Sequence, residues 1–243
     1  MAQDFSRGGF AVLVTTTTMI YHPDVKGRPC DRLIITRGKS FSAALAPAGK
    51  SGSITVAAPS DTLQGGERKL RGFLPEVIDT LASEGLFDLI LVEADGAKHL
   101  PIKAPRTGEP VVPASAACVF GVIGLDALGS VISGETVFRT EEFCAVTGKH
   151  QGDTVDRQAL VNLITSAEGL FRNAPPEAEK IVVLNKADSA EAVQQGVETG
   201  SYIAKRTSVP DRIFITSGHC TDTGGPIKAL LNTEHLRKTN GYF

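Results

Sequence analysis

Short apolar runs rich in β-branched residues recur along the chain, and they constrain its fold more than any other feature. They are continuous rather than alternating, which is typical of strands buried on both faces of a parallel sheet. The runs cover residues 10–15, 33–36, 54–57, 87–92, 117–123, 180–184 and 212–216. Helical patterns lie between several of them, over residues 67–84, 155–170 and 189–206. This order predicts a three-layer α/β fold, in which helices cover the faces of a mostly parallel sheet.

Length and composition limit the classes of protein that fit. We predict a single domain over residues 1–243, with a small antiparallel excursion at about 31–58, where a Gly- and Ser-rich segment joins two strands without a crossover helix. Hydrophobic residues make up 42% and charged residues 21%, which excludes disordered and coiled-coil classes. The net charge of -2 gives no field that would attract nucleic acid or an anionic membrane. We therefore expect a small-molecule or protein partner, no nucleic acid and no membrane.

The cysteines and the first residues bear on the compartment. The four cysteines are far apart and form no CxxC pair, which favours a reducing environment. The first ten residues lack the apolar stretch of a signal peptide, and no apolar run reaches the ~18 residues of a membrane span. We expect a cytoplasmic protein.

An NKxD motif, Asn185-Lys186-Ala187-Asp188, directly follows an apolar strand. In GTP-binding proteins, a carboxylate at this position accepts two hydrogen bonds from the guanine edge, while the Asn and the Lys stem frame the ring. The alternative is that Asp188 or Ser189 begins a turn and caps the next helix. A second strand is followed by residues 215–218 (ITSG), where another base-contacting loop would lie. The context favours a nucleotide site.

Acidic residues follow the strand at 87–92, in the segment LVEADGAK. Carboxylates at the end of a buried strand are unfavourable unless they hold a cation or take a proton, so Glu93 and Asp95 suggest Mg²⁺ coordination, directly or through water. Lys98 follows three residues later. The alternative is that Asp95 caps a helix.

Four threonines, Thr15 to Thr18, close the strand at 10–15. Their hydroxyls suit contacts with phosphate and Mg²⁺, although a polar strand end is an equal alternative because threonine favours strands. A phosphate loop would read GxxxxGK[ST] between a strand and a helix. Neither Gly38-Lys39-Ser40 nor Gly49-Lys50-Ser51 fits that pattern, because the first glycine is missing and neither segment opens a helix.

Residues 99–115 contain four prolines and therefore predict an extended loop. The loop directly follows a buried strand, at the end of the sheet where ligands bind in α/β folds. A long loop in that position is usually functional.

Five segments together resemble the YqeC family. In chain order they are VLVTTTTMIYHP, LVEADGAKHLPIKAPRTGEPVVP, VIGLDALG, VFRTEEF and VVLNKAD. The resemblance covers nearly the whole chain and implies a P-loop NTPase fold. It also implies a role in selenium cofactor biosynthesis, as an accessory protein in the maturation of selenium-dependent molybdenum hydroxylases, driven by binding or hydrolysis of ATP or GTP. Family members begin with a glycine-rich GKT loop and a helix before the VTTTT strand. We therefore expect this chain to lack the first strand and the phosphate loop. We also expect unpaired backbone groups to be exposed beside residues 10–15.

The resemblance also implies roles for individual residues. Thr16, Thr17, Glu93 and Asp95 would lie near Mg²⁺ and phosphate, and Asn185, Lys186 and Asp188 at the base. Catalytic roles would fall to Glu93, Asp95 and Lys98, and substrate contacts to Lys103, Glu109, Asp126 and Arg139. The implied partners are a nucleotide and a molybdenum hydroxylase or its maturation proteins. Two alternatives stay open: a metabolite kinase or ATP-dependent ligase whose acceptor lies in the Pro-rich loop, and a non-catalytic interaction module.

Overall fold

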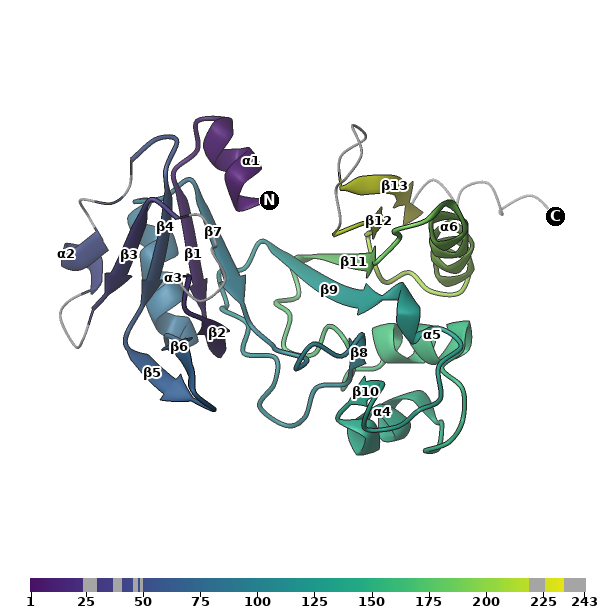
Figure 1. Ribbon diagram of the computed structural model, residues 1–243. Helices are drawn as coiled ribbons and strands as arrows, with labels where there is room; N and C mark the ends of the chain where they lie inside the picture. The colour runs from purple at the N-terminus through teal and green to yellow at the C-terminus, as the bar shows by residue number, and fades with distance from the viewer. Residues whose placement is uncertain (24–29, 37–40, 46–47, 49, 219–225, 234–243) are drawn as a thin grey trace. The chain divides into compact units, whose positions relative to one another are not determined.

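The computed structural model describes residues 1–23, 30–36, 41–45, 48, 50–218 and 226–233 (Figure 1). Its contacts divide the chain into two compact units, whereas the sequence predicted one domain. Unit 1 comprises Met1–Gly96 with Val111–Ser115, and unit 2 comprises Ala97–Pro110 with Ala116–Phe243. Each unit contains parallel strands and helices, so the α/β prediction is confirmed.

Unit 1 is built on a four-stranded parallel sheet of order β3-β4-β1-β7. Its helix α3 begins at Pro75, which suits the first helical position, and ends before Gly85 in the left-handed conformation. Ile78 and Leu81 of that helix join the core of the unit. The elements are α1 (Ala2–Arg7), β1 (Val12–Thr16), β2 (Met19–Tyr21), β3 (Arg32–Ile35), α2 (Phe41–Leu45), β4 (Ile54–Ala58), β5 (Asp61–Gln64), β6 (Glu67–Arg71), α3 (Pro75–Glu84) and β7 (Leu89–Glu93).

Two predictions about unit 1 are wrong. The antiparallel excursion at 31–58 is a parallel pair instead, because α2 lies between β3 and β4 and allows the chain to return in the same direction. The helix expected over 67–84 is confined to α3, since residues 67–71 form β6 in the antiparallel sheet β2-β6-β5. Gly65 and Gly66 both have positive φ and make the two-residue turn between β5 and β6.

The strand predicted at residues 10–15 has a partner strand on each side. As β1 it pairs with β4 on one side and with β7 on the other, so the expected exposed backbone beside it is not found. The two segments weighed as phosphate loops, residues 38–40 and 49–51, lie wholly or partly outside the described residues.

Unit 2 contains a second sheet, of order β13-β12-β11-β9, in which only β13 is antiparallel. A separate parallel pair joins β8 to β10, so the Pro-rich loop contains a short strand that the sequence did not indicate. The elements are β8 (Ile102–Lys103), β9 (Cys118–Gly124), the 3-10 turn η3 (Leu125–Ala127), β10 (Val137–Phe138), α4 (Thr140–Thr147), α5 (Arg157–Thr165), β11 (Glu179–Asn185), α6 (Ala190–Ala204), β12 (Arg212–Thr216) and β13 (Ile227–Asn232).

The core of unit 2 lies between its sheet and its helices. Phe143 of α4, Leu160 and Leu163 of α5 and Ile203 of α6 are completely buried with Leu184 of β11. Among the described helices of both units, none has the length and apolar character that crossing a membrane requires.

Candidate functional site

The carboxyl ends of β9, β11 and β12 form one edge of the sheet in unit 2. These strands are parallel neighbours, with Asn185 in register with Gly124 and Leu184 with Ile215. The polar loops that follow them therefore lie at the same edge, which is where ligands bind in open α/β sheets. This places the NKxD motif beside the segment that begins at Thr216.

Hydroxyl groups from the end of β12 hold the NKxD side chains. The Thr216 hydroxyl donates to Asn185 Oδ1 at 3.0 Å, and the Ser217 hydroxyl donates to Asp188 Oδ1 at 2.5 Å. Ser217 is buried, whereas Asp188 is exposed. The Asp188 carboxylate is thus anchored by Ser217 and keeps further acceptor positions for a ligand.

The helix cap is supplied by a different residue. Ser189 accepts a hydrogen bond from the Ala192 N–H at the start of α6. The capping alternative is therefore fulfilled by Ser189, and Asp188 is available for another role. Lys186 has a positive φ of 68°, and its ammonium lies 2.6 Å from Asp126 in η3. The lysine stem consequently runs from the NKxD loop to the end of β9.

A second group of charged side chains gathers around the Pro-rich loop. In the β8–β10 pair, Lys103 is in register with Phe138, and Arg139 follows directly. Glu109 accepts from Lys103 at 2.7 Å, from Arg139 at 2.9 Å and from Arg106 at 3.1 Å. The Glu109 side chain is 17% exposed and that of Lys103 only 8%. We call Lys98, Lys103, Arg106 and Arg139, with Glu109 and Phe138, the cationic cluster.

Phe138 lies at the centre of this cluster. Lys98 Nζ, Lys103 Nζ and Arg139 Cζ are 5.1, 5.3 and 5.0 Å from its ring centroid, within the range of cation–π interactions. Burial raises the pKa of Glu109, but the hydrogen bond and charge of Lys103 and the charges of Arg139 and Arg106 outweigh burial, so the net pKa is lowered. Glu109 is therefore a permanent anion at neutral pH.

The threonines of unit 1 use their hydroxyl protons on backbone carbonyls. Thr15 donates to Ala57 at 2.9 Å, Thr16 to Glu93 at 2.8 Å and Thr17 to Val111 at 2.6 Å. A hydroxyl whose proton is used in this way cannot donate to a phosphate oxygen, although it can still offer a lone pair to a cation. Thr16 Oγ1 also accepts from the Thr18 N–H at 2.9 Å and lies 3.1 Å from Thr18 Oγ1. The hydroxyl protons of these threonines therefore stabilise the fold, as expected for a polar strand end. Any contact with Mg²⁺ would have to use a hydroxyl oxygen.

The predicted metal ligands lie at the end of β7. Glu93 pairs in register with Thr16 of β1 and its side chain is exposed, whereas Asp95 is partly buried. No helix begins at Asp95, so the capping alternative is wrong. In the part of the chain that the structure describes, no three His, Cys, Asp or Glu side chains form a metal-binding group. Two carboxylates nevertheless suit Mg²⁺, which usually keeps several waters and takes one or two carboxylates from the protein.

The predicted site residues thus fall into groups. Lys98, Lys103, Glu109 and Arg139 are brought together, as are Lys186 with Asp126 and Asp188 with the segment after β12. Unit 1 holds Thr16, Thr17, Glu93 and Asp95, and unit 2 holds the others. The sequence analysis missed Arg106 and Phe138. Arg106 lies in the same loop as the predicted lysine and could have been found from that position, but nothing local marks Phe138.

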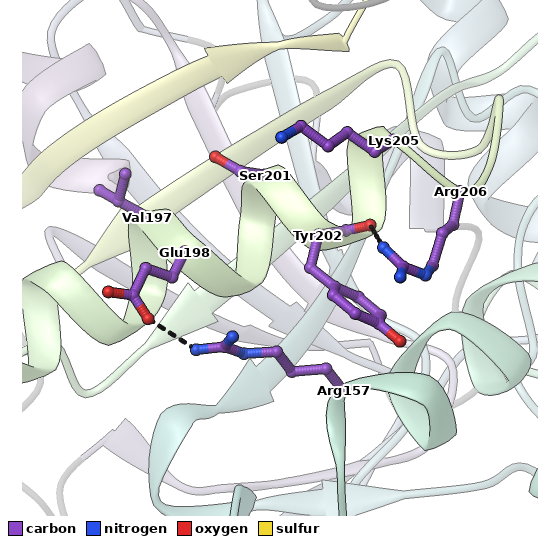
Figure 2. A pocket seen from close by; sticks show the side chains of 7 residues that line it. All are labelled: Arg157, Val197, Glu198, Ser201, Tyr202, Lys205 and Arg206. Atoms are coloured by element: carbon purple, nitrogen blue, oxygen red, sulfur yellow. Dashed lines mark hydrogen bonds and ion pairs between the residues drawn. The ribbon is translucent and has the colours of Figure 1, made fainter.

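An open pocket of about 390 Å³ is lined by α5 and α6 (Figure 2). Arg157 reaches across it to Glu198 at 2.8 Å, and the Arg206 guanidinium stacks 3.4 Å from the centroid of the Tyr202 ring. None of the predicted site residues, all of which the structure describes, lines this pocket.

Comparisons with known proteins bear on residues from both units. The family model described as YqeC protein matches residues 1–141. A curated relative, "Uncharacterized protein YqeC" of Escherichia coli (strain K12), is 37% identical over 123 residues, which is 51% of this chain and 48% of that protein. The chain thus covers about half the length of this relative, and no solved structure matches it significantly. Since the family model covers more than half of the chain and includes the threonine run, the Pro-rich loop and Arg139, the chain belongs to the YqeC family.

Proposed function

We propose that this protein binds a guanine nucleotide through the NKxD loop. On this proposal it acts in selenium cofactor biosynthesis, as an accessory protein in the maturation of selenium-dependent molybdenum hydroxylases. The observation that carries the nucleotide proposal is the anchored carboxylate of Asp188, with Asn185 held beside it by Thr216. The accessory role follows from the family resemblance, and nucleotide binding or hydrolysis would drive it.

The chemistry of the loop favours guanine over adenine. A carboxylate only accepts hydrogen bonds, and the guanine edge offers two neighbouring N–H donors where adenine offers a donor and an acceptor. Ser217 occupies one acceptor position of Asp188, which leaves enough for both guanine donors. Fixing the carboxylate in advance reduces the entropy that binding would otherwise lose.

A Mg²⁺ site is proposed separately for unit 1. Glu93 and Asp95 would hold Mg²⁺, and Thr16 and Thr17 would lie near it, as in a P-loop NTPase-like fold. When bound, the metal would neutralise phosphate charge. The parallel pairing of β1 with β7, which puts Thr16 beside Glu93, supports this placement.

The test is a calorimetric titration of the full chain with GTP and with ATP. We expect the unmodified chain to prefer GTP and Asp188→Ala to lose that preference. Loss of a charge-assisted pair of hydrogen bonds corresponds to roughly 2–3 kcal/mol, or about a 30- to 150-fold weaker affinity for GTP. Equal affinity of the unmodified chain for both nucleotides would exclude guanine recognition.

Glu177→Gln provides the matched control. Glu177 is exposed, belongs to the same unit, and has no recorded partner among the described residues, so the control removes one negative charge without touching the loop. Asp95→Asn tests the metal separately: it should remove Mg²⁺-dependent affinity and leave the preference for guanine intact. For the cellular role, loss of the protein should lower the activity of a selenium-dependent molybdenum hydroxylase, and the Asp188→Ala variant should fail to restore it.

A kinase or ligase activity on a small molecule is the second candidate. The observation that favours it is the cationic cluster, which provides charged groups for an acceptor in the Pro-rich loop. A screen of small molecules for nucleotide turnover tests this candidate.

A further inference from the structure

We propose that the cationic cluster binds a phosphate group, or a similarly compact oxyanion with two negative charges. This site is distinct from the base loop and does not depend on the proposed nucleotide preference. Three cationic side chains, Lys103, Arg106 and Arg139, contact the carboxylate of Glu109, and a fourth, Lys98, lies over the same Phe138 ring as Lys103 and Arg139.

The carboxylate of Glu109 already accepts three hydrogen bonds from cationic side chains. Its Oε1 accepts from Arg106 and Arg139, and its Oε2 accepts from Lys103. Three of the cations lie within 5.3 Å of the same ring centroid and therefore repel one another. A bound dianion would remove most of this repulsion.

Arg139 gives a second and independent observation. It adopts the left-handed conformation, with φ of 66° and ψ of 57°, immediately before α4. Its Nε is buried and has no hydrogen-bond partner among the described residues. Such a backbone is unfavourable for an arginine, and a buried donor without a partner is destabilising. An oxyanion beside the guanidinium would supply the missing acceptor after a small adjustment of the side chain.

The cluster is accessible through its exposed members. Lys98 is exposed, and the Arg106 side chain is 56% exposed and contacts Glu109 only through Nε. The two terminal nitrogens of Arg106 and the Lys98 ammonium can therefore reach a ligand from solvent. Arginine forks and lysine ammonium groups are the donors that proteins use for phosphate. Phe138 adds an apolar wall, which strengthens the attraction between charges beside it.

Inorganic phosphate is the probe for the test. It is titrated calorimetrically into the full chain, with chloride adjusted to keep the ionic strength constant. Lys98→Gln and Arg106→Gln each remove one exposed cation, so the fold should be kept and the melting temperature should change little. We expect each variant to bind phosphate about tenfold more weakly or worse. Lys205→Gln, which makes the same change at an exposed lysine outside the cluster, should bind like the unmodified chain.

Two results would overturn the proposal: no phosphate binding by the unmodified chain, or unaltered binding by both Lys98→Gln and Arg106→Gln. Competition then identifies the source of the phosphate. If phosphate weakens the binding of GTP but not of guanosine, the cluster takes the phosphates of the nucleotide itself. If phosphate and GTP bind together, it takes the phosphate of a second ligand. Asp188→Ala should lose guanosine binding and keep phosphate binding, so failure of one proposal is distinguishable from failure of the other.

Discussion

Replacing Glu109 by glutamine should destabilise unit 2, and the effect should depend on pH. The substitution keeps the size of the side chain and removes the charge that pairs with Lys103, Arg139 and Arg106. Breaking a buried ion pair costs roughly 3–5 kcal/mol. The exposed partner Arg106 adds little, because surface pairs contribute only about 0–1 kcal/mol. Since Glu109 keeps 17% exposure and glutamine retains one oxygen acceptor, we expect a loss of about 2–3 kcal/mol at pH 7.

The sign of the pH dependence follows from the lowered pKa of Glu109. A carboxyl group whose pKa is lower in the folded state stabilises the fold above its unfolded pKa, about 4.3, and this stabilisation is lost as the pH falls through the folded pKa. The difference between the unmodified chain and Glu109→Gln should therefore be largest at neutral pH and shrink in acid. Unfolding in urea at several pH values between 7 and 3 measures it, with Glu177→Gln as the matched control. A loss of stability that is equal at pH 7 and pH 3, or no loss at pH 7, would refute the electrostatic account.

Three further outcomes are expected. Gly72→Ala should lower the stability of unit 1 by about 1–3 kcal/mol in thermal melts, because a Cβ there would lie 2.3–2.6 Å from backbone atoms of the threonine run. Gly134→Ala is the control and should be neutral, because a Cβ at that position meets nothing within 4 Å. Burial and nearby carboxylates raise the pKa of Cys118 to about 11, so only about a thousandth of it is thiolate at pH 8, and mass spectrometry should find it alkylated far more slowly than a free thiol. Asp79→Ala should cost about 1–2 kcal/mol in urea at pH 7 and less in acid, because Asp79 accepts hydrogen bonds from Ser115 that lower its pKa more than burial raises it.

The parallel strands of both large sheets could be predicted from the sequence because each is a continuous apolar run, whereas the antiparallel strand β13, in which Lys228 interrupts the apolar residues, was missed. The hairpin of β5 and β6 was missed, although two adjacent glycines at 65 and 66 are a strong hairpin signal. The periodicity of Leu70 and Phe73 matched a helix, and strand pairing overrode it. The parallel return at 31–58 was missed because α2 is only five residues long.

The candidate site was predictable where its residues share a loop. Lys98, Lys103 and Glu109 follow one another along the Pro-rich segment, so their proximity is a local property. Phe138 joins them only through the pairing of β8 with β10, which connects residues more than thirty positions apart. Two-residue strands carry no periodic pattern, and no local rule could have revealed that pairing.

The path of the chain between the two units has a consequence for synthesis. The chain leaves unit 1 after Gly96, returns for Val111–Ser115 and leaves again. The returning segment supplies the carbonyl that accepts the Thr17 hydroxyl and the serine that binds Asp79. A nascent chain that has grown only to Gly96 therefore lacks part of its first unit. On the ribosome, unit 1 can be completed only after residue 115 has emerged. By then, the part of the Pro-rich loop that belongs to unit 2 has already been synthesised.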